Sequence, residues 1–215
     1  MKEDILEQLV DDYFQAEGYF TRHNIKFRPR RDHPDFKSNK DSNHSDIDVI
    51  GIHPKRKGFE EVVAVSCKSW QGGFRIATKI DEIEKNKKVS GRVAWQAFRE
   101  LTIPKWSEAF IDAVETATGS RKFTYVLAVT VIVGDRGDWE RYPRFVEAMG
   151  GNPIRLIDLT EMLNRIRSTS TTTVASSTIG RVLQLMRAAE KGKKALVRAV
   201  QAQTDDDSSV NEVDG

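Results

Sequence analysis

Apolar residues at the start of the chain repeat with the spacing of a helix. Positions 5, 6, 9, 10, 13 and 14 are apolar, and 3.6 residues per turn place them on one face. We expect a helix from Ile5 to Phe14, with Gly18 as its stop signal. The following run, Tyr19 to Phe27, alternates loosely and contains aromatic and β-branched residues, which predicts a short strand.

Two further runs predict a β-hairpin. Ile47 to His53 and Glu61 to Cys67 are strand-like, and the segment between them holds Pro54 and Gly58, which suit a turn. Residues 62–65 are apolar at consecutive positions, which is typical of a central strand covered on both faces. The polar segment from Phe27 to about Ser45 predicts a long loop.

The rest of the chain alternates between helical and strand patterns. We expect helices near 80–87, 93–116 (interrupted at Pro104), 142–149 and 159–166, strands at 123–133 and 154–157, and a turn at 134–137. This order, αβββαβαβα, predicts an α/β sandwich in which helices flank a central mixed sheet.

The chain is long enough for one domain with appendages. We expect a folded domain over residues 1–167 and a Ser/Thr-rich linker over 168–178. A basic amphipathic helix would follow over 179–203, and an acidic, disordered tail over 204–215.

Composition excludes several classes of protein. The 34 Lys and Arg residues nearly balance the 32 Asp and Glu residues, so attraction to nucleic acid must come from local clusters. A single cysteine, Cys67, allows neither an internal disulfide nor a zinc cluster. The acidic N-terminus lacks the pattern of a signal peptide, and no run approaches the ~20 apolar residues of a membrane span. We therefore expect a cytoplasmic protein with no membrane partner.

The hairpin carries the candidate chemistry. In a strand, alternate side chains share a face, so Ser66 and Lys68 project together, as do Asp46 and Asp48. Pairing of the two strands would bring a carboxylate beside a lysine. A divalent ion prefers oxygen ligands, and a neighbouring ammonium group orients water and stabilises charge on a phosphate.

This pattern resembles the PD-(D/E)xK nuclease superfamily: a strand-borne Asp, a hairpin, and then a Lys at the end of an apolar strand. The Cys67-Lys68-Ser69-Trp70 ending is similar to the Mrr-like restriction endonuclease branch, as are a helical Glu7 and the pair Gly18-Tyr19. The resemblance covers roughly residues 5–163 and rests on three short segments. It implies a restriction-endonuclease-like fold with a C-terminal helical extension, and an Mg²⁺- or Mn²⁺-dependent endonuclease acting on double-stranded DNA in restriction, phage defence or repair.

The resemblance also implies a role for each matching residue. Asp48 would be the principal metal ligand, Lys68 the catalytic lysine, the Cys67 carbonyl a backbone ligand and Glu7 an outer ligand, with Gln96 as a candidate positioning residue. An acidic, solvated helix face is the alternative interpretation of Glu7, which lies near Glu3 and Asp11.

One departure from the pattern bears on activity. Ser66 stands where the family has a carboxylate, and a hydroxyl is a weaker ligand for a divalent cation. Asp46 and Glu60 share strand parity with Asp48 and Ser66 and are candidates to compensate. The alternative function is a degenerate nuclease-fold module that binds DNA or a partner protein without cutting.

Basic clusters and the C-terminal segment are candidate interaction elements. The DNA-binding candidates are Arg28, Arg30, Arg31, Lys55, Arg56 and Lys57, although each cluster is equally typical of a solvated face. The long loop before Ser45 is a candidate DNA-facing element. The resemblance implies a homodimer, because cutting both strands commonly needs two copies, and the basic helix is a candidate docking site for a protein partner.

Overall fold

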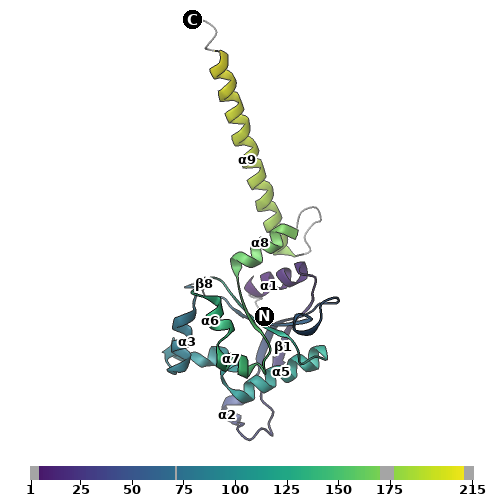
Figure 1. Ribbon diagram of the computed structural model, residues 1–215, viewed down its shortest axis with the longest axis vertical. Coiled ribbons are helices and arrows are strands. Elements are labelled where there is room, and N and C mark those ends of the chain that lie inside the picture. The colour runs from purple at the N-terminus through teal and green to yellow at the C-terminus, as the bar shows by residue number, and fades with distance from the viewer. Residues whose placement is uncertain (1–4, 71, 170–176, 211–215) are drawn as a thin grey trace. The chain divides into compact units, whose positions relative to one another are not determined.

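The computed structural model describes residues 5–70, 72–169 and 177–210, and the chain divides into two units, residues 1–165 and 166–215 (Figure 1). In the described part of the first unit, a five-stranded sheet has the order β1-β2-β3-β7-β9. The pairs β1–β2 and β2–β3 are antiparallel, whereas β3–β7 and β7–β9 are parallel. The strands are β1 (Phe20–Phe27), β2 (Ser45–Ile52), β3 (Val62–Lys68), β7 (Thr124–Val129) and β9 (Ile154–Asp158). The predicted α/β class with a central mixed sheet is thus confirmed.

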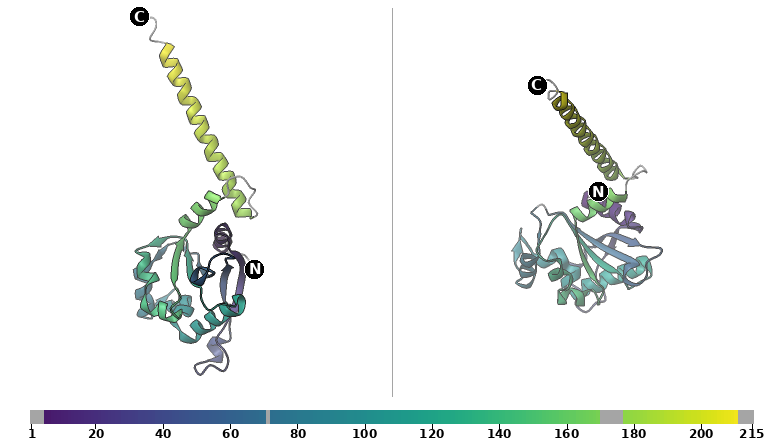
Figure 2. Two further views of the ribbon diagram at one scale, coloured as in Figure 1. Left: turned by 45° about the vertical axis from the view of Figure 1, so that its right-hand side comes forward. Right: turned by 45° about the horizontal axis from the view of Figure 1, so that its top comes forward.

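Helices cover both faces of this sheet, which explains its apolar strands (Figure 2). On one face lie α1 (Ile5–Ala16) and α8 (Leu159–Thr169), joined by a hydrogen bond from the Tyr13 hydroxyl to Glu161 at 3.2 Å. The other face carries α3 (Ile76–Glu84), α4 (Arg99–Thr102), α5 (Pro104–Thr118), α6 (Arg136–Glu140) and α7 (Pro143–Ala148). Because β3 is covered on both sides, residues 62–66 are all buried.

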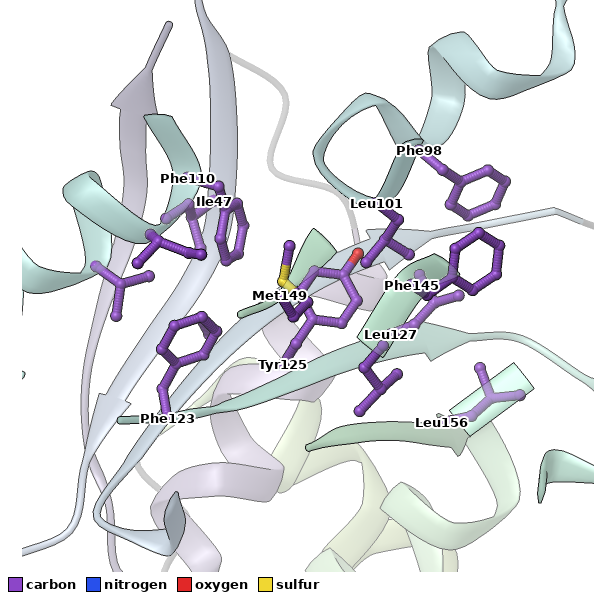
Figure 3. Close-up of a cluster of buried hydrophobic side chains, with 14 of the residues drawn as sticks. Ile47, Phe98, Leu101, Phe110, Phe123, Tyr125, Leu127, Phe145, Met149 and Leu156 are labelled. Atoms are coloured by element: carbon purple, nitrogen blue, oxygen red, sulfur yellow. The ribbon is translucent and has the colours of Figure 1, made fainter. Parts of the chain in front are cut away.

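The larger core lies between the sheet and the second group of helices (Figure 3). Alternate residues of β3, Val62 and Ala64, join this core, as do Tyr125 and Leu127 of β7. Figure 3 shows the Tyr125 hydroxyl pointing from the sheet toward the helix that carries Leu101. Ser66 and Lys68 have the same strand parity as Ala64, so their side chains belong to this face.

Several predicted elements are confirmed. The first helix, the first strand, the hairpin, the last strand and the helix after it are present, with ends shifted by a few residues. Gly18 follows α1 with a φ of 91° and takes up the left-handed conformation expected of a helix stop.

The segment predicted as one helix from 93 to 116 is three elements. Residues Ala94–Phe98 form a 3₁₀ helix, α4 is a single turn, and α5 begins at Pro104. Proline lacks the N–H that an interior helical position needs, so Pro104 starts a new helix at the expected interruption.

The strand predicted from 123 to 133 ends early. It stops at Val129, and β8 (Ile132–Val133) instead pairs with β4 (Phe74–Arg75) in a separate two-stranded sheet. The predicted turn at 134–137 enters α6, whose N-cap Asp135 accepts a hydrogen bond from the N–H of Gly137 at 2.8 Å.

A small hairpin that the sequence pattern did not predict follows α3. It pairs β5 (Lys88–Val89) with β6 (Arg92–Val93), and both turn residues have positive φ, 50° at Ser90 and 81° at Gly91. Two left-handed residues are the requirement of a tight type I′ turn.

In the second unit, α9 (Thr178–Val210) extends beyond the predicted helix end. This helix includes residues 204–210, which were predicted to belong to a disordered tail, and residues 193–210 contain no glycine or proline to stop it. Residues 170–176 of the predicted linker and 211–215 of the tail lie outside the described residues. No described helix has the length and apolar character that crossing a membrane requires.

The loop between β1 and β2 is anchored by a buried carboxylate. It contains a helical turn that was not predicted, α2 (Ser38–Asp41). Asp41, the last residue of this turn, is only 3% exposed. Lys105 Nζ lies 2.6 Å from Asp41 Oδ2, and Trp106 Nε1 donates to Oδ1 at 3.3 Å. Burial by itself raises the pKa of Asp41, but hydrogen bonds from Lys105 and Lys37 outweigh burial and lower it overall.

We expect Asp41→Ala to lower the free energy of unfolding by about 3 kcal/mol, because it leaves the mostly buried Lys105 ammonium without its partner. Urea denaturation at neutral pH measures the change. The matched control is Asp32→Ala in the same loop, whose carboxylate is 83% exposed and whose removal costs less than about 0.5 kcal/mol. Equal effects would show that Asp41 does not anchor the loop.

Candidate functional site

The Asp48 carboxylate lies where strands β2 and β3 stop pairing. The last pair of this ladder is Val49 with Val65, and beyond it Asp48 Oδ2 accepts a hydrogen bond from the N–H of Cys67 at 2.6 Å. A side chain thus replaces a main-chain partner at the end of the ladder. This bond ties β2 to the C-terminal end of β3, beside Lys68.

Strand β2 is irregular at Asp48. Ile47 and Ile50 both join the larger core although they are three residues apart, a spacing that places side chains of a regular strand on opposite faces. On β1, Asn24 has a φ of 55° at the corresponding point of the ladder. The expectation that Asp46 and Asp48 share a face assumed a regular strand. In the structure Asp46 is exposed whereas Asp48 is half-buried.

Ser66 and Lys68 meet as their strand parity predicts. Lys68 Nζ donates to Ser66 Oγ at 3.1 Å, and Ser66 is only 5% exposed. The Lys68 charge acts to lower the pKa of Asp48. Asp48, Ser66 and Lys68 therefore form one group on one face of the sheet.

A second buried carboxylate, Glu100 of α4, reaches this group. Glu100 is 5% exposed, and its Oε1 accepts a hydrogen bond from the Tyr125 hydroxyl at 2.8 Å. Burial, the charge of Glu100 and the hydrogen bond to Glu100 together raise the pKa of Tyr125 well above its ordinary value, while a hydrogen bond from Ser66 lowers it. A neutral phenol therefore links Glu100 to Ser66 and Lys68.

The electrostatics of Asp48 show a carboxylate short of positive charge. Burial is the largest cause that raises its pKa, and the charges of Glu100 and Asp46 raise it further. The hydrogen bond from Cys67 and the charge of Lys68 act in the opposite direction but do not cancel the rise. A cation held here would relieve this imbalance.

A divalent cation fits this donor set in part. Asp48 and Glu100 offer carboxylate oxygens, and the Cys67 carbonyl is the main-chain ligand that the family resemblance implies. Among the described residues, no cluster of three or more His, Cys, Asp or Glu side chains is arranged to hold a metal ion. Two carboxylates and main-chain oxygens would have to suffice.

Other predicted site residues lie apart from this group. Glu7 is in the first turn of α1, whose helix covers the opposite face of the sheet, and its role as an outer ligand stays a prediction. Gln96 is exposed in the 3₁₀ helix and lines a cavity beside Trp70. Glu60 is the last residue of the 3₁₀ helix Gly58–Glu60 before β3, at the other end of that strand from Ser66, so it does not compensate for Ser66 in this structure.

The two predicted basic clusters lie at opposite ends of the sheet. Arg28, Arg30 and Arg31 follow the end of β1, which pairs with the start of β2 and so lies at the Asp48 end. Lys55, Arg56 and Lys57 precede β3, roughly 20 Å of extended strand away from Lys68. Moreover, Arg56 contacts Glu17 at 2.8 Å and the Tyr19 hydroxyl at 3.1 Å. Only the first cluster is placed to border the Asp48 group.

The sequence pattern did not single out Glu100 or Tyr125. Both lie far from the hairpin in the sequence, and only the packing of α4 on β7 brings them to Ser66. The signal that existed was a lone carboxylate between the apolar residues Phe98 and Leu101. Comparisons with known proteins leave the site to be interpreted on its geometry, since no family model, curated protein or solved structure matches the chain.

The raised pKa of Asp48 predicts a pH-dependent effect of Asp48→Asn. Folding favours the neutral carboxyl, so the stability it contributes is present below its unfolded pKa, near 3.9, and is lost as the pH rises through the folded pKa. Asparagine keeps an oxygen that can accept from Cys67 but carries no charge. We therefore expect Asp48→Asn to stabilise the fold at about pH 7 and to have little effect near pH 4.

Urea denaturation across this pH range measures the effect. The matched control is Asp112→Asn, whose side chain is 42% exposed on α5. An increase in the free energy of unfolding for Asp48→Asn that is independent of pH, or equal to that for Asp112→Asn, would contradict the burial of an unbalanced charge at Asp48.

Proposed function

We propose that the chain is a metal-dependent endonuclease that hydrolyses phosphodiester bonds of DNA, on a fold of the restriction-endonuclease kind. The observation that carries the proposal is the convergence of Asp48, Ser66 and Lys68 on one face of the sheet, with the buried Glu100 behind them. The residues of the PD-(D/E)xK-like pattern are thus joined by the fold as well as by the sequence. Double-stranded DNA is the proposed substrate, and restriction, phage defence or repair the proposed setting.

Each residue has a proposed task. Asp48, Glu100 and the Cys67 carbonyl would hold Mg²⁺ or Mn²⁺, which supplies neutralisation of the charge that builds on the scissile phosphate. Lys68 orients the attacking water and stabilises the same charge. Ser66 positions the lysine through the 3.1 Å hydrogen bond between Nζ and Oγ. The oxygen of the attacking water forms the new bond to phosphorus, and the bond from phosphorus to the leaving deoxyribose oxygen breaks. That leaving oxygen takes up the proton that the water loses.

Nicking of supercoiled plasmid in the presence of Mn²⁺ tests this assignment. We expect Asp48→Ala and Lys68→Ala each to lower the cleavage rate at least about a hundredfold. Asp112→Ala, at a partly exposed position of α5, and Lys122→Ala, at an exposed position, remove the same side-chain types away from the site and should cleave like the wild type. Cleavage that persists unchanged in the Asp48 and Lys68 variants would reject the assignment.

The second candidate function is a nuclease-fold module that binds DNA or a partner protein without cutting. Ser66 favours it, because a hydroxyl occupies the position at which the related pattern has a carboxylate. The two candidates differ in what Glu100 does. In an active enzyme it supplies the second carboxylate, whereas in a degenerate module it is only a buried acceptor for Tyr125.

Two substitutions separate these candidates. If Glu100 is the second carboxylate, Glu100→Gln lowers the plasmid-nicking rate at least about tenfold, with circular dichroism confirming the fold, while Ser66→Asp changes the rate little. If the module is degenerate, the wild type does not nick DNA and Ser66→Asp restores nicking. A fully active Glu100→Gln variant would remove Glu100 from the site.

A further inference from the structure

A cavity of about 720 Å³ is lined by Trp70, which follows the C-terminal end of β3. One wall is Trp70, two residues beyond Lys68 in the chain. The Trp70 N–H donates a hydrogen bond to the Lys68 carbonyl at 3.0 Å. The Trp70 carbonyl in turn accepts from Thr130 Oγ1 at 2.5 Å. The main chain thus fixes this wall to the end of β3. The volume of the cavity falls within the range of about 300–1,000 Å³ that is usual for sites of small organic ligands.

The walls combine an aromatic surface with polar and charged groups. The six lining residues that carry this character are Trp70, Lys79, Glu82, Arg92, Gln96 and Arg99. The Trp70 ring is stacked on the buried Phe74 at 5.9 Å between ring centroids. Lys79 Nζ lies over the same ring, 4.9 Å from its centroid. An aromatic wall next to ammonium, amide and guanidinium donors suits a flat, heteroatom-rich ring.

The charge of the cavity favours an anionic ligand. Lys79 is balanced by Glu82 at 2.7 Å, and the Arg99 guanidinium lies 4.6 Å from the centroid of the Trp106 ring. Arg92, in contrast, is exposed and has no ion-pair partner among the described residues. The excess positive charge therefore lies with the arginines, one of them on the β5–β6 hairpin at the cavity wall.

We infer that this cavity binds one unstacked nucleotide of the DNA, next to the phosphate that is cut. The inference rests on the proposed function, since the link to the proposed scissile phosphate is the Trp70 wall, whose N–H is hydrogen-bonded to the Lys68 carbonyl. A stacked base within a duplex presents only its edges, so a base enters a concave pocket only from a single strand or after flipping out of a helix. The chemistry in both cases is a base beside Trp70, Lys79 and Gln96 with its phosphate near Arg92.

Binding to a fluorescein-labelled oligo-dT strand in EDTA tests the inference without cleavage. We expect Arg92→Glu to raise the dissociation constant at least about tenfold. The matched control is Lys88→Glu, which makes the same charge change at an exposed position of the same hairpin but outside the cavity lining. It should raise the dissociation constant much less. Gln96→Glu, at a second exposed wall position, should weaken binding as Arg92→Glu does.

A duplex with a central 2-aminopurine distinguishes the two sources of the nucleotide. A rise in 2-aminopurine fluorescence on binding to the wild type, lost in Arg92→Glu, identifies a base flipped from a helix. An Arg92-dependent affinity for oligo-dT without that rise identifies a single strand. Equal effects of Arg92→Glu and Lys88→Glu on both probes would overturn the inference, because the cavity would then contribute only general charge.

The plasmid assay separates this inference from the proposed function. If oligo-dT binding depends on Arg92 and Gln96 but the wild type does not nick DNA, the nuclease proposal fails and the nucleotide site stands. If nicking depends on Asp48 and Lys68 but the cavity variants bind like their control, the nucleotide site fails and the nuclease proposal stands.

Discussion

The hydrogen bond from the Cys67 N–H to the Asp48 carboxylate determines the geometry of the candidate site. It forms where the β2–β3 ladder ends, so it holds the two strands together at the point where main-chain pairing no longer does. The acidic side chain is thereby kept beside Lys68. Burial at this position raises the pKa of Asp48, which makes the site favourable for a cation.

A polar chain extends from this bond into the apolar core. Lys68 donates to Ser66, Ser66 hydrogen-bonds to Tyr125, and Tyr125 donates to Glu100. Polar groups in such surroundings are tolerated because each has a partner. These hydrogen bonds connect the helix that carries Glu100 to the strand that carries Lys68. We therefore expect a substitution at either end to alter the position of the side chain at the other.

The surroundings of the Asp48–Lys68 group are built by connections rather than by the sheet. The loop after β1 brings Arg28, Arg30 and Arg31 to the same end of the sheet and is held on α5 by Asp41. On the other side, Trp70 and the β5–β6 hairpin contribute to the wall of the cavity. Since connections tolerate more sequence change than strands, under the proposed nuclease function these segments would set substrate preference.

The sequence by itself determined the α/β class, the hairpin and the shared face of Ser66 and Lys68, because these follow from local periodicity. Only the tertiary structure decided that Glu100 and Tyr125 join them, and that Lys55 to Lys57 lie at the far end of β3. It also decided that β7 ends at Val129 and that the next strand, β8, pairs with β4 instead. Each of these depends on contacts between residues distant in the chain, which a local pattern does not encode. The irregularity of β2 at Asp48 belongs with them, since the alternation of residues along the sequence predicts a regular strand there.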